Sequence, residues 1–315
     1  MILSVSRRTD IPAFYSEWFM NRLKEEYIYV RNPMNTKQIS KIPVSSDVVE
    51  CIVFWSKNPK PLMSYLPEID KLGHNYYFQF TVTSYDTSLE SCVPKKTEII
   101  QAFKALSEMI GKEKVIWRYD PIILTDVFTK EYHFKWFEYL ADELKDYTDK
   151  CVISFVDSYE KTKRNMKDIK TVGITSEDIE EICCRLAGIV KDKNIQLETC
   201  AHDLDFSKFG IKHSKCVDDY LISKITNNMF DIPKDKMQRN ECGCVESRDI
   251  GSYNTCLHKC LYCYANFNSD IVDKNSKAHE PNSPLLFGVL SGDETISEYK
   301  PKIFRSGSVS WEKFV

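Results

Sequence analysis

Apolar runs of strand length alternate with segments of helical periodicity over residues 1–228, and this alternation constrains the fold more than any other feature of the chain. Six runs are predicted to be strands, at residues 2–6, 51–55, 77–82, 115–119, 151–156 and 195–199. Between them, Ile99, Phe103, Leu106 and Ile110 fall on one helical face. A second predicted helix follows a Thr175-Ser-Glu-Asp178 start signal. The pattern is typical of βα units around a mostly parallel sheet, so we predict an α/β fold.

Domain organisation follows from length and from where the alternation stops. The 315 residues suffice for one large α/β domain with a sizeable core. We predict a single domain over 1–315, made of βα repeats (1–228), a cysteine-rich segment (229–270) that folds back onto the barrel or sheet, and a packed tail (271–315). Only ten glycines occur, and none form G-x-G-x-x-G or G-x4-G-K-[ST], which weakens a Rossmann or P-loop interpretation.

Charge and hydropathy limit the partners that we expect. The formal net charge is -3 and the pI is about 6.1, so charge alone gives no reason to expect nucleic acid as a partner. No apolar run approaches the roughly 18 residues of a membrane span, and the first residues, MILSVSRRTD, do not resemble a signal sequence. Twelve cysteines, five of them within residues 242–263, are typical of metal ligation in a reducing compartment. We therefore expect a cytoplasmic protein without membrane contact.

Cys256, Cys260 and Cys263 have the spacing C-x3-C-x2-C. A cubane iron-sulfur cluster normally takes four protein thiolates, so three leave one iron open to a substrate or cofactor. Zinc is the alternative, but zinc ribbons are usually built from paired C-x2-C units. The spacing favours a [4Fe-4S] cluster over zinc.

Cys242 and Cys244 form a separate Cys-Gly-Cys unit that does not complete a site by itself. Cys200 and Cys216, both beyond the last predicted strand, are candidate partners. The four thiolates would make a closed site, either an auxiliary iron-sulfur cluster or a structural zinc. His213 and His258 lie near cysteines, and each is expected to be a hydrogen-bonding neighbour of a cluster and not a ligand. The other five cysteines are expected to be packing residues.

The motif C-x3-C-x-Tyr-C resembles the signature of the radical S-adenosylmethionine superfamily, in which it usually lies near the amino terminus. Residues 52–59, 80–94 and 115–122 are similar, in that order, to strand segments of the spore photoproduct lyase-like branch. The whole chain also resembles the bacterial domain-of-unknown-function 1848 family, through SRRTDIPA near the amino terminus and the late CGC and C-x3-C-x2-C block. The resemblances imply a TIM-like partial (β/α)6 barrel, circularly permuted so that the cluster-bearing strand comes last.

The resemblance implies an enzyme that uses a [4Fe-4S] cluster to cleave S-adenosylmethionine to a 5′-deoxyadenosyl radical. It also implies an external one-electron donor such as flavodoxin or ferredoxin, and a small-molecule or macromolecular substrate that the sequence does not identify. The alternatives are a non-catalytic iron-sulfur or zinc protein and, with less support, a lyase acting on DNA lesions.

The similarity of these segments to that branch also implies cofactor-binding residues. Lys57, beside Ser56, would pair with the methionine carboxylate, unless it is a surface lysine. Thr9 and Asp10 would accept from the cofactor amine, although Asp10 is equally suited to be a helix N-cap. Tyr262 would lie next to the adenine. The remaining candidates lie on predicted strands. Arg118 and Asp120 end one strand, with an internal ion pair as the alternative role. Gln79 and Thr81 share one face of another strand with Thr83, as a polar barrel interior would require.

Overall fold

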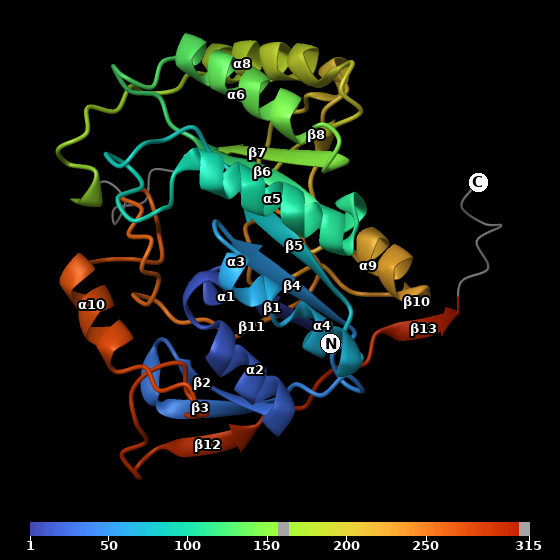
Figure 1. Cartoon of the computed structure of the whole chain (residues 1–315), viewed down its shortest axis with the longest axis vertical. Coiled ribbons are helices and arrows are strands. Elements are labelled where there is room, and N and C mark those ends of the chain that lie inside the picture. The colour runs from blue at the N-terminus through green and yellow to red at the C-terminus, as the bar shows by residue number, and fades with distance from the viewer. Residues whose placement is uncertain (157–163, 309–315) are drawn as a thin grey trace.

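A parallel sheet of eight strands forms the centre of the computed structural model, which describes residues 1–156 and 164–308 (Figure 1). Every neighbouring pair in it is parallel. The six predicted strands are confirmed, and only the end of β6 differs from the prediction by more than one residue. In spatial order the strands are β11 (Arg248–Asp249), β1 (Ile2–Val5), β4 (Cys51–Ser56), β5 (Tyr76–Thr81), β6 (Val115–Ile122), β7 (Lys150–Phe155), β8 (Gln196–Thr199) and β9 (Lys212–His213).

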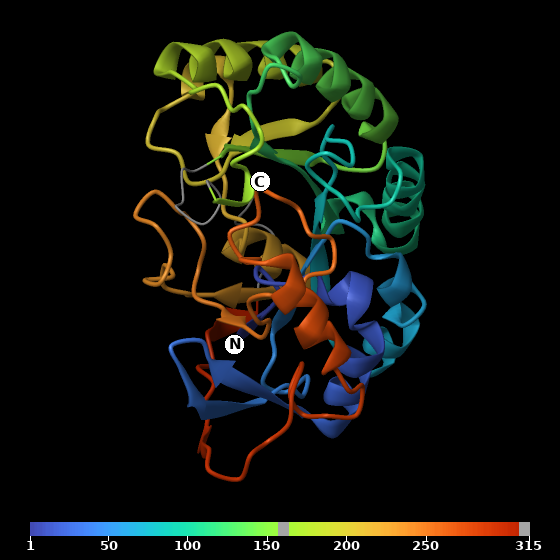
Figure 2. The same ribbon diagram turned by 90° about the vertical axis from the view of Figure 1, so that its left-hand side faces the viewer.

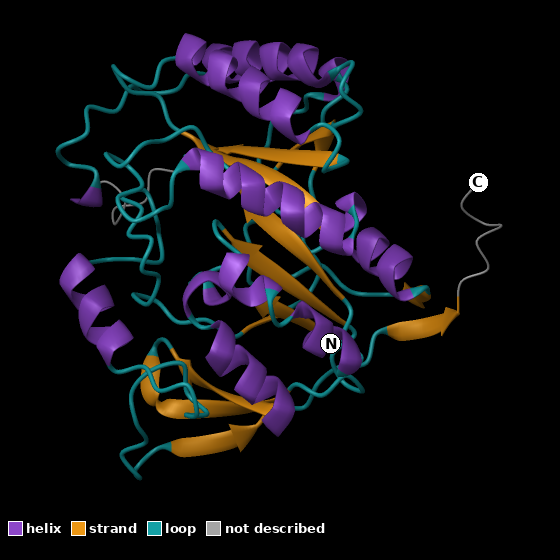
Figure 3. Cartoon of the chain, viewed as in Figure 1, coloured by secondary structure: helices purple, strands orange, loops and turns teal. Residues whose placement is uncertain are grey.

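Helices follow most of these strands, and Figure 3 shows them grouped around the sheet. Both predicted helices are confirmed, and a capping box of Thr175 and Asp178 starts the second. The helices are α1 (Ile11–Phe14), α2 (Ser16–Glu25), α3 (Lys60–Met63), α4 (Leu66–Lys71), α5 (Lys96–Ile110), α6 (Lys130–Leu144), α8 (Ser176–Val190), α9 (Asp219–Thr226) and α10 (Ser269–Lys277), with short 3-10 turns at Lys112–Lys114 and Ser207–Phe209. None of the helices in the described part of the chain is long and apolar enough to cross a membrane.

Successive side chains of a strand point to opposite sides of the sheet, and the two faces pack against different parts of the chain. Phe54, Phe78 and Trp117 pack with the apolar faces of α5, α6 and α8 in the largest buried cluster. Val53 and Tyr77, which alternate with them, pack instead against the segment 216–245. Figure 2 shows this orange segment on the side of the strands away from α5 and α6. The cysteine-rich segment therefore folds back onto the sheet, as the sequence predicts.

The strand that precedes the cysteine motif lies next to the first strand of the chain. β11 pairs with β1 through Leu3 and Arg248, and through Ser4 and Asp249. The carboxylate of Asp249 accepts hydrogen bonds from the hydroxyls of Ser4 (2.9 Å) and Ser6 (2.8 Å). A late segment of the chain thus forms the edge of the sheet beside β1.

Two smaller sheets were not predicted. β2 (Tyr27–Asn32) and β3 (Asn35–Pro43) form an antiparallel hairpin, and β12 (Thr295–Glu298) adds to β3 in parallel. β10 (Asn228–Phe230) pairs with β13 (Arg305–Ser308). The first five residues of β3 alternate too little to signal a strand, since four of them are polar and exposed. The described part of the tail thus pairs with β3 and β10. Residues 309–315 of the predicted tail lie outside the described residues. The single-domain organisation stays a prediction.

The five cysteines that were expected to pack divide into two groups. Cys51, Cys151 and Cys183 are buried, as predicted. Cys92 and Cys184 are exposed, so the packing prediction is wrong for these two. Cys92 follows a loop at the carboxyl end of β5, and Cys184 lies on the outer side of α8, positions that need no apolar side chain.

Candidate functional site

Asp10 connects the ends of two strands to the cysteine motif. Its carboxylate accepts hydrogen bonds from the amide of Ala13 (3.0 Å) and the hydroxyl of Ser56 (2.8 Å). It also accepts one from the amide of Lys57 (2.7 Å), and Nε2 of His258 lies 2.8 Å away. Asp10 is therefore the N-cap of α1, and it connects this cap to the side chain of His258. A role of Asp10 toward a cofactor amine stays a prediction.

Glu90 is a second buried carboxylate at this end of the sheet, and sequence reasoning missed it. Its side chain is 1% exposed. It accepts from the ammonium groups of Lys57 (2.8 Å) and Lys96 (2.5 Å), from the hydroxyl of Thr83 (2.6 Å) and from the phenol of Tyr262. Burial alone would raise the pKa of Glu90, but the two lysines hold it well below its ordinary value. Lys57 is thus a half-buried cation paired with a buried carboxylate, and the surface-lysine alternative is wrong.

The loop that carries Glu90 packs directly on the cysteine motif. Glu90 and Cys260 form an isolated antiparallel bridge. The amide of Leu261 donates to the carbonyl of Leu89 (2.9 Å), and the Cys92 amide donates to the carbonyl of His258 (3.2 Å). In the sequence Glu90 stands in a mostly polar stretch that also contains Asp86, so no local signal marks it as a buried ion.

Cys256, Cys260 and Cys263 lie in one loop at this site. The thiol of Cys260 interacts electrostatically with those of Cys256 and Cys263, and burial raises the pKa of all three thiols. Tyr262 lies between Cys260 and Cys263 in the sequence, and Nζ of Lys57 lies over its ring, 5.6 Å from the ring centroid. In the described ranges 1–156 and 164–308, no group of three or more histidine, cysteine, aspartate or glutamate side chains is already gathered at metal-binding geometry.

Several buried polar atoms have no hydrogen-bond partner among the residues that the structure describes, and two of them lie beside Asp10. They are Oγ1 of Thr9 and Nδ1 of His258. Thr9 precedes Asp10, and the Nε2 of His258 binds the same Asp10 carboxylate. A buried polar group without a partner costs free energy, so these two atoms favour a bound group that would satisfy them.

Arg118 and Asp120 form the internal ion pair that was the alternative for them. Nε of Arg118 donates to Oδ2 of Asp120 at 2.9 Å, and Nη2 donates to the same oxygen. Nη1 of Arg118 reaches Oε1 of Gln79 (3.2 Å) and Sγ of Cys216 (2.8 Å). Gln79 therefore faces the segment 216–245, while half-buried Thr81 is the register partner of Arg118. Their contact with a cofactor stays a prediction.

Cys200, Cys216, Cys242 and Cys244 are brought together as the sequence analysis grouped them, and we call them the thiol quartet. Sγ of Cys200 lies 3.4 Å from Sγ of Cys216. The Cys216 and Cys244 thiols shift each other's pKa, as do the Cys244 and Cys242 thiols, and Sγ of Cys244 accepts from the amide of Val217 at 3.4 Å. The quartet joins the end of β8 to two separate parts of the segment that covers the sheet.

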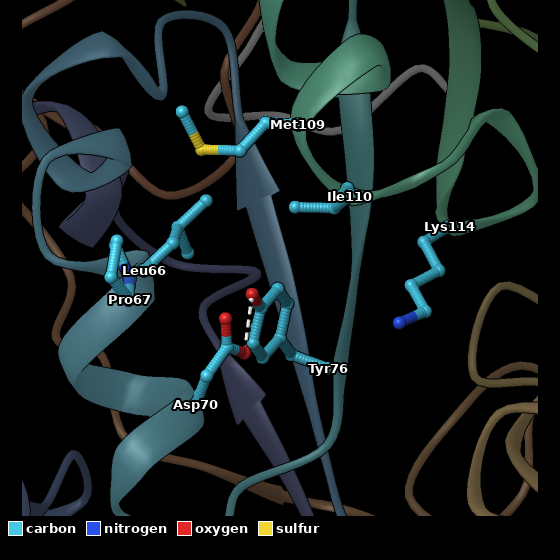
Figure 4. Close-up of a pocket in the computed structure, with 7 residues that line it drawn as sticks. All are labelled: Leu66, Pro67, Asp70, Tyr76, Met109, Ile110 and Lys114. Carbon is cyan, nitrogen blue, oxygen red and sulfur yellow. Dashed lines mark hydrogen bonds between the residues drawn. The ribbon is translucent and has the colours of Figure 1, made fainter.

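A shallow pocket lies at the opposite end of the strands (Figure 4). Tyr76 is the first residue of β5, and its hydroxyl donates to Asp70 at 2.9 Å. The other lining residues are Leu66, Pro67, Met109, Ile110 and Lys114. None of the predicted site residues lines this pocket, so we place the candidate site at the carboxyl ends of the strands, where parallel α/β folds collect functional groups.

Comparisons with known proteins identify a family but no activity. A family model described as a domain of unknown function, DUF1848, matches residues 2–265. A search of curated proteins finds no match. Among solved structures, a protein of Bacteroides thetaiotaomicron, provisionally named an alpha-L-fucosidase, is 9% identical over 72% of this chain and 80% of its own, with a TM-score of 0.26. A similarity that weak carries no argument about fold or activity.

Proposed function

From the premise that the chain belongs to the DUF1848 family, we propose that it is a radical S-adenosylmethionine enzyme. In this proposal Cys256, Cys260 and Cys263 hold a [4Fe-4S] cluster and leave one iron open for the cofactor. The substrate is not identified. The fold would be a partial barrel of the TIM type, permuted so that its cluster-bearing strand is supplied last.

The position of β11 is the observation that carries the proposal. β11 lies beside β1 in the parallel sheet, and the cysteine loop starts seven residues after it. The motif is therefore late in the sequence but stands before β1 in the order of strands. This is the arrangement that a circular permutation of the superfamily barrel would produce.

The residues around the motif fit the proposed cofactor. The unpartnered Oγ1 of Thr9 and Nδ1 of His258 supply polar atoms that a bound group could use. Asp10 holds Ser56 and the Lys57 amide in place, so it would act by positioning the ends of β1 and β4. The cluster, when bound, would supply the electron that cleaves S-adenosylmethionine reductively to methionine and a 5′-deoxyadenosyl radical.

The ammonium group of Lys57 would have to form ion pairs with both Glu90 and the methionine carboxylate. Glu90 already has a second cation, Lys96, at 2.5 Å. The loss of one lysine contact would therefore leave the buried carboxylate paired. The electron would come from an external one-electron donor such as flavodoxin or ferredoxin, which we propose as the partner.

The test is anaerobic reconstitution with iron and sulfide, followed by reduction with dithionite in the presence of S-adenosylmethionine. We expect about four irons at the motif and release of 5′-deoxyadenosine. Cys256→Ala, Cys260→Ala and Cys263→Ala should each abolish both, while Cys92→Ala, a change of an exposed cysteine, should alter neither.

Two outcomes would contradict the proposal. An intact cluster that never yields 5′-deoxyadenosine would leave a non-catalytic iron-sulfur protein. Zinc without acid-labile sulfide at these three cysteines would remove the cluster as well.

A further inference from the structure

The thiol quartet is separate from the cysteine motif. We propose that Cys200, Cys216, Cys242 and Cys244 bind one zinc ion in a closed four-thiolate site. The inference goes beyond the proposed function and does not depend on it, because none of the four residues belongs to the C-x3-C-x2-C motif.

The contacts among the sulfurs favour a single ion over a cluster. A tetrahedral zinc site with Zn–S of about 2.3 Å separates its sulfurs by about 3.8 Å. The Cys200 and Cys216 sulfurs are 3.4 Å apart, and Sγ of Cys244 accepts from the amide of Val217, the residue after Cys216, at 3.4 Å. A cubane cluster holds its thiolates on different irons, and therefore farther apart.

The thiols touch one after another in this structure and do not yet enclose a common centre. Binding would draw them around the ion, and each thiol would release its proton to solvent as it becomes a ligand. The bound state would consist of Zn²⁺ and four thiolates, with two negative charges in excess.

Two arginines lie where this excess charge would need compensation. Nη1 of Arg118 donates to Sγ of Cys216 at 2.8 Å. Arg7 interacts electrostatically with the thiols of Cys244 and Cys216, and its buried Nη2 has no hydrogen-bond partner among the described residues. Both guanidinium groups lie over the ring of Trp55, 5.1 Å and 5.3 Å from its centroid. Arg118, which is also paired with Asp120, and half-buried Arg7 thus place positive charge beside Cys200, Cys216 and Cys244, which favours the ionised, metal-bound form.

The backbone between Cys242 and Cys244 is also suited to bringing the two halves of the quartet together. A Cβ on Gly243 would lie 3.2 Å from the carbonyl oxygen of Ser214, two residues before Cys216. Glycine therefore permits this close approach. The Cys216 carbonyl is held in turn by the hydroxyl of Tyr77 (2.7 Å) and the amide of Gln79 (2.8 Å). The metal would thus fasten the segment over β5 and β6.

The first experiment measures metal in protein expressed and purified anaerobically. We expect one zinc ion per chain that survives gel filtration. The paired variants Cys200→Ser/Cys216→Ser and Cys242→Ser/Cys244→Ser should lower the zinc content at least ~10-fold. The controls are Cys92→Ser/Cys184→Ser, which changes two exposed thiols, and a variant with all three cysteines of the motif changed to serine. Both controls should keep the zinc, so this result is independent of radical chemistry.

A second measurement needs no variant and so does not depend on how the variants fold. Cobalt(II) exchanged into the wild-type protein should give the thiolate charge-transfer and d–d bands of a tetrahedral thiolate site. Alkylation mapped by mass spectrometry should modify the quartet only after chelation. The proposal is overturned if the wild-type protein contains iron and sulfide that the quartet variants lack. A disulfide between Cys200 and Cys216, or an equal zinc content in the wild type and the quartet variants, would also overturn it.

Discussion

Nε2 of His258 lies 2.8 Å from Oδ2 of Asp10, although 248 positions separate the two residues in the sequence. The contact attaches the cysteine loop to the N-cap of the first helix. The same carboxylate holds Ser56 and the Lys57 amide, so one buried side chain links β1, β4 and the cysteine loop. The candidate site therefore depends on interactions that connect the two ends of the chain.

Asp10→Ala should destabilise the fold. The change leaves the Ser56 hydroxyl, the Lys57 amide and His258 without their buried acceptor, at a cost of about 3 kcal/mol. Urea-induced unfolding would measure this, with Asp47→Ala, at an exposed position, as the control. Equal unfolding midpoints for the two variants would rule out the linking role of Asp10.

Glu90→Gln should cost about 3 kcal/mol of unfolding free energy, because it leaves the half-buried ammonium groups of Lys57 and Lys96 without their buried carboxylate. Glu108→Gln, on the exposed side of α5, is the matched control and should change stability by less than about 0.5 kcal/mol. Chemical denaturation of both variants tests the difference. A loss for Glu90→Gln no larger than for the control would mean that the lysines do not depend on Glu90.

Gly251→Ala should disrupt the attachment of β11 to β1. A Cβ at this position would lie 1.9 Å from Oγ of Ser6, which is bound to Asp249. We expect a loss of about 2 kcal/mol or more. Gly188→Ala, in α8 with nothing within 4 Å of the added carbon, should instead stabilise the protein by about 0.5–1 kcal/mol. Thermal unfolding that shifts in the same direction for both variants would refute the close approach.

His133 should make stability fall as the pH is lowered. Burial lowers its pKa to about 4 from an ordinary value of 6.5. The unfolded chain therefore binds the proton more readily, so stability is complete above about pH 6.5 and declines as the pH falls toward 4. Between about pH 7.5 and pH 5 this residue contributes a loss of about 2 kcal/mol.

His133→Gln should remove that part of the pH dependence. The urea midpoint of each protein at the two pH values gives the comparison, and contributions from shared carboxylates cancel in the difference. An unchanged pH slope in the variant would show that His133 does not take up the proton on unfolding.

Local patterns determined much of this protein. Apolar periodicity predicted six strands and two helices, because each depends on residues that are neighbours in the sequence. The Asp10 cap and the Thr175 capping box are equally local. Cysteine position also suggested the grouping of four thiols that the structure brings together, while their binding of a metal stays a prediction.

The tertiary structure alone decided the rest. β11 has two residues and no pattern of its own, and it is a strand only because Leu3 and Ser4 lie beside it. The sequence around Glu90 is typical of a solvent-exposed acid, and only the folded structure surrounds its carboxylate with Lys57, Lys96 and Tyr262. Both depend on contacts between distant residues. The sequence by itself therefore determined which elements form and which cysteines belong together, whereas long-range packing decided which strand lies beside β1 and which charge is buried.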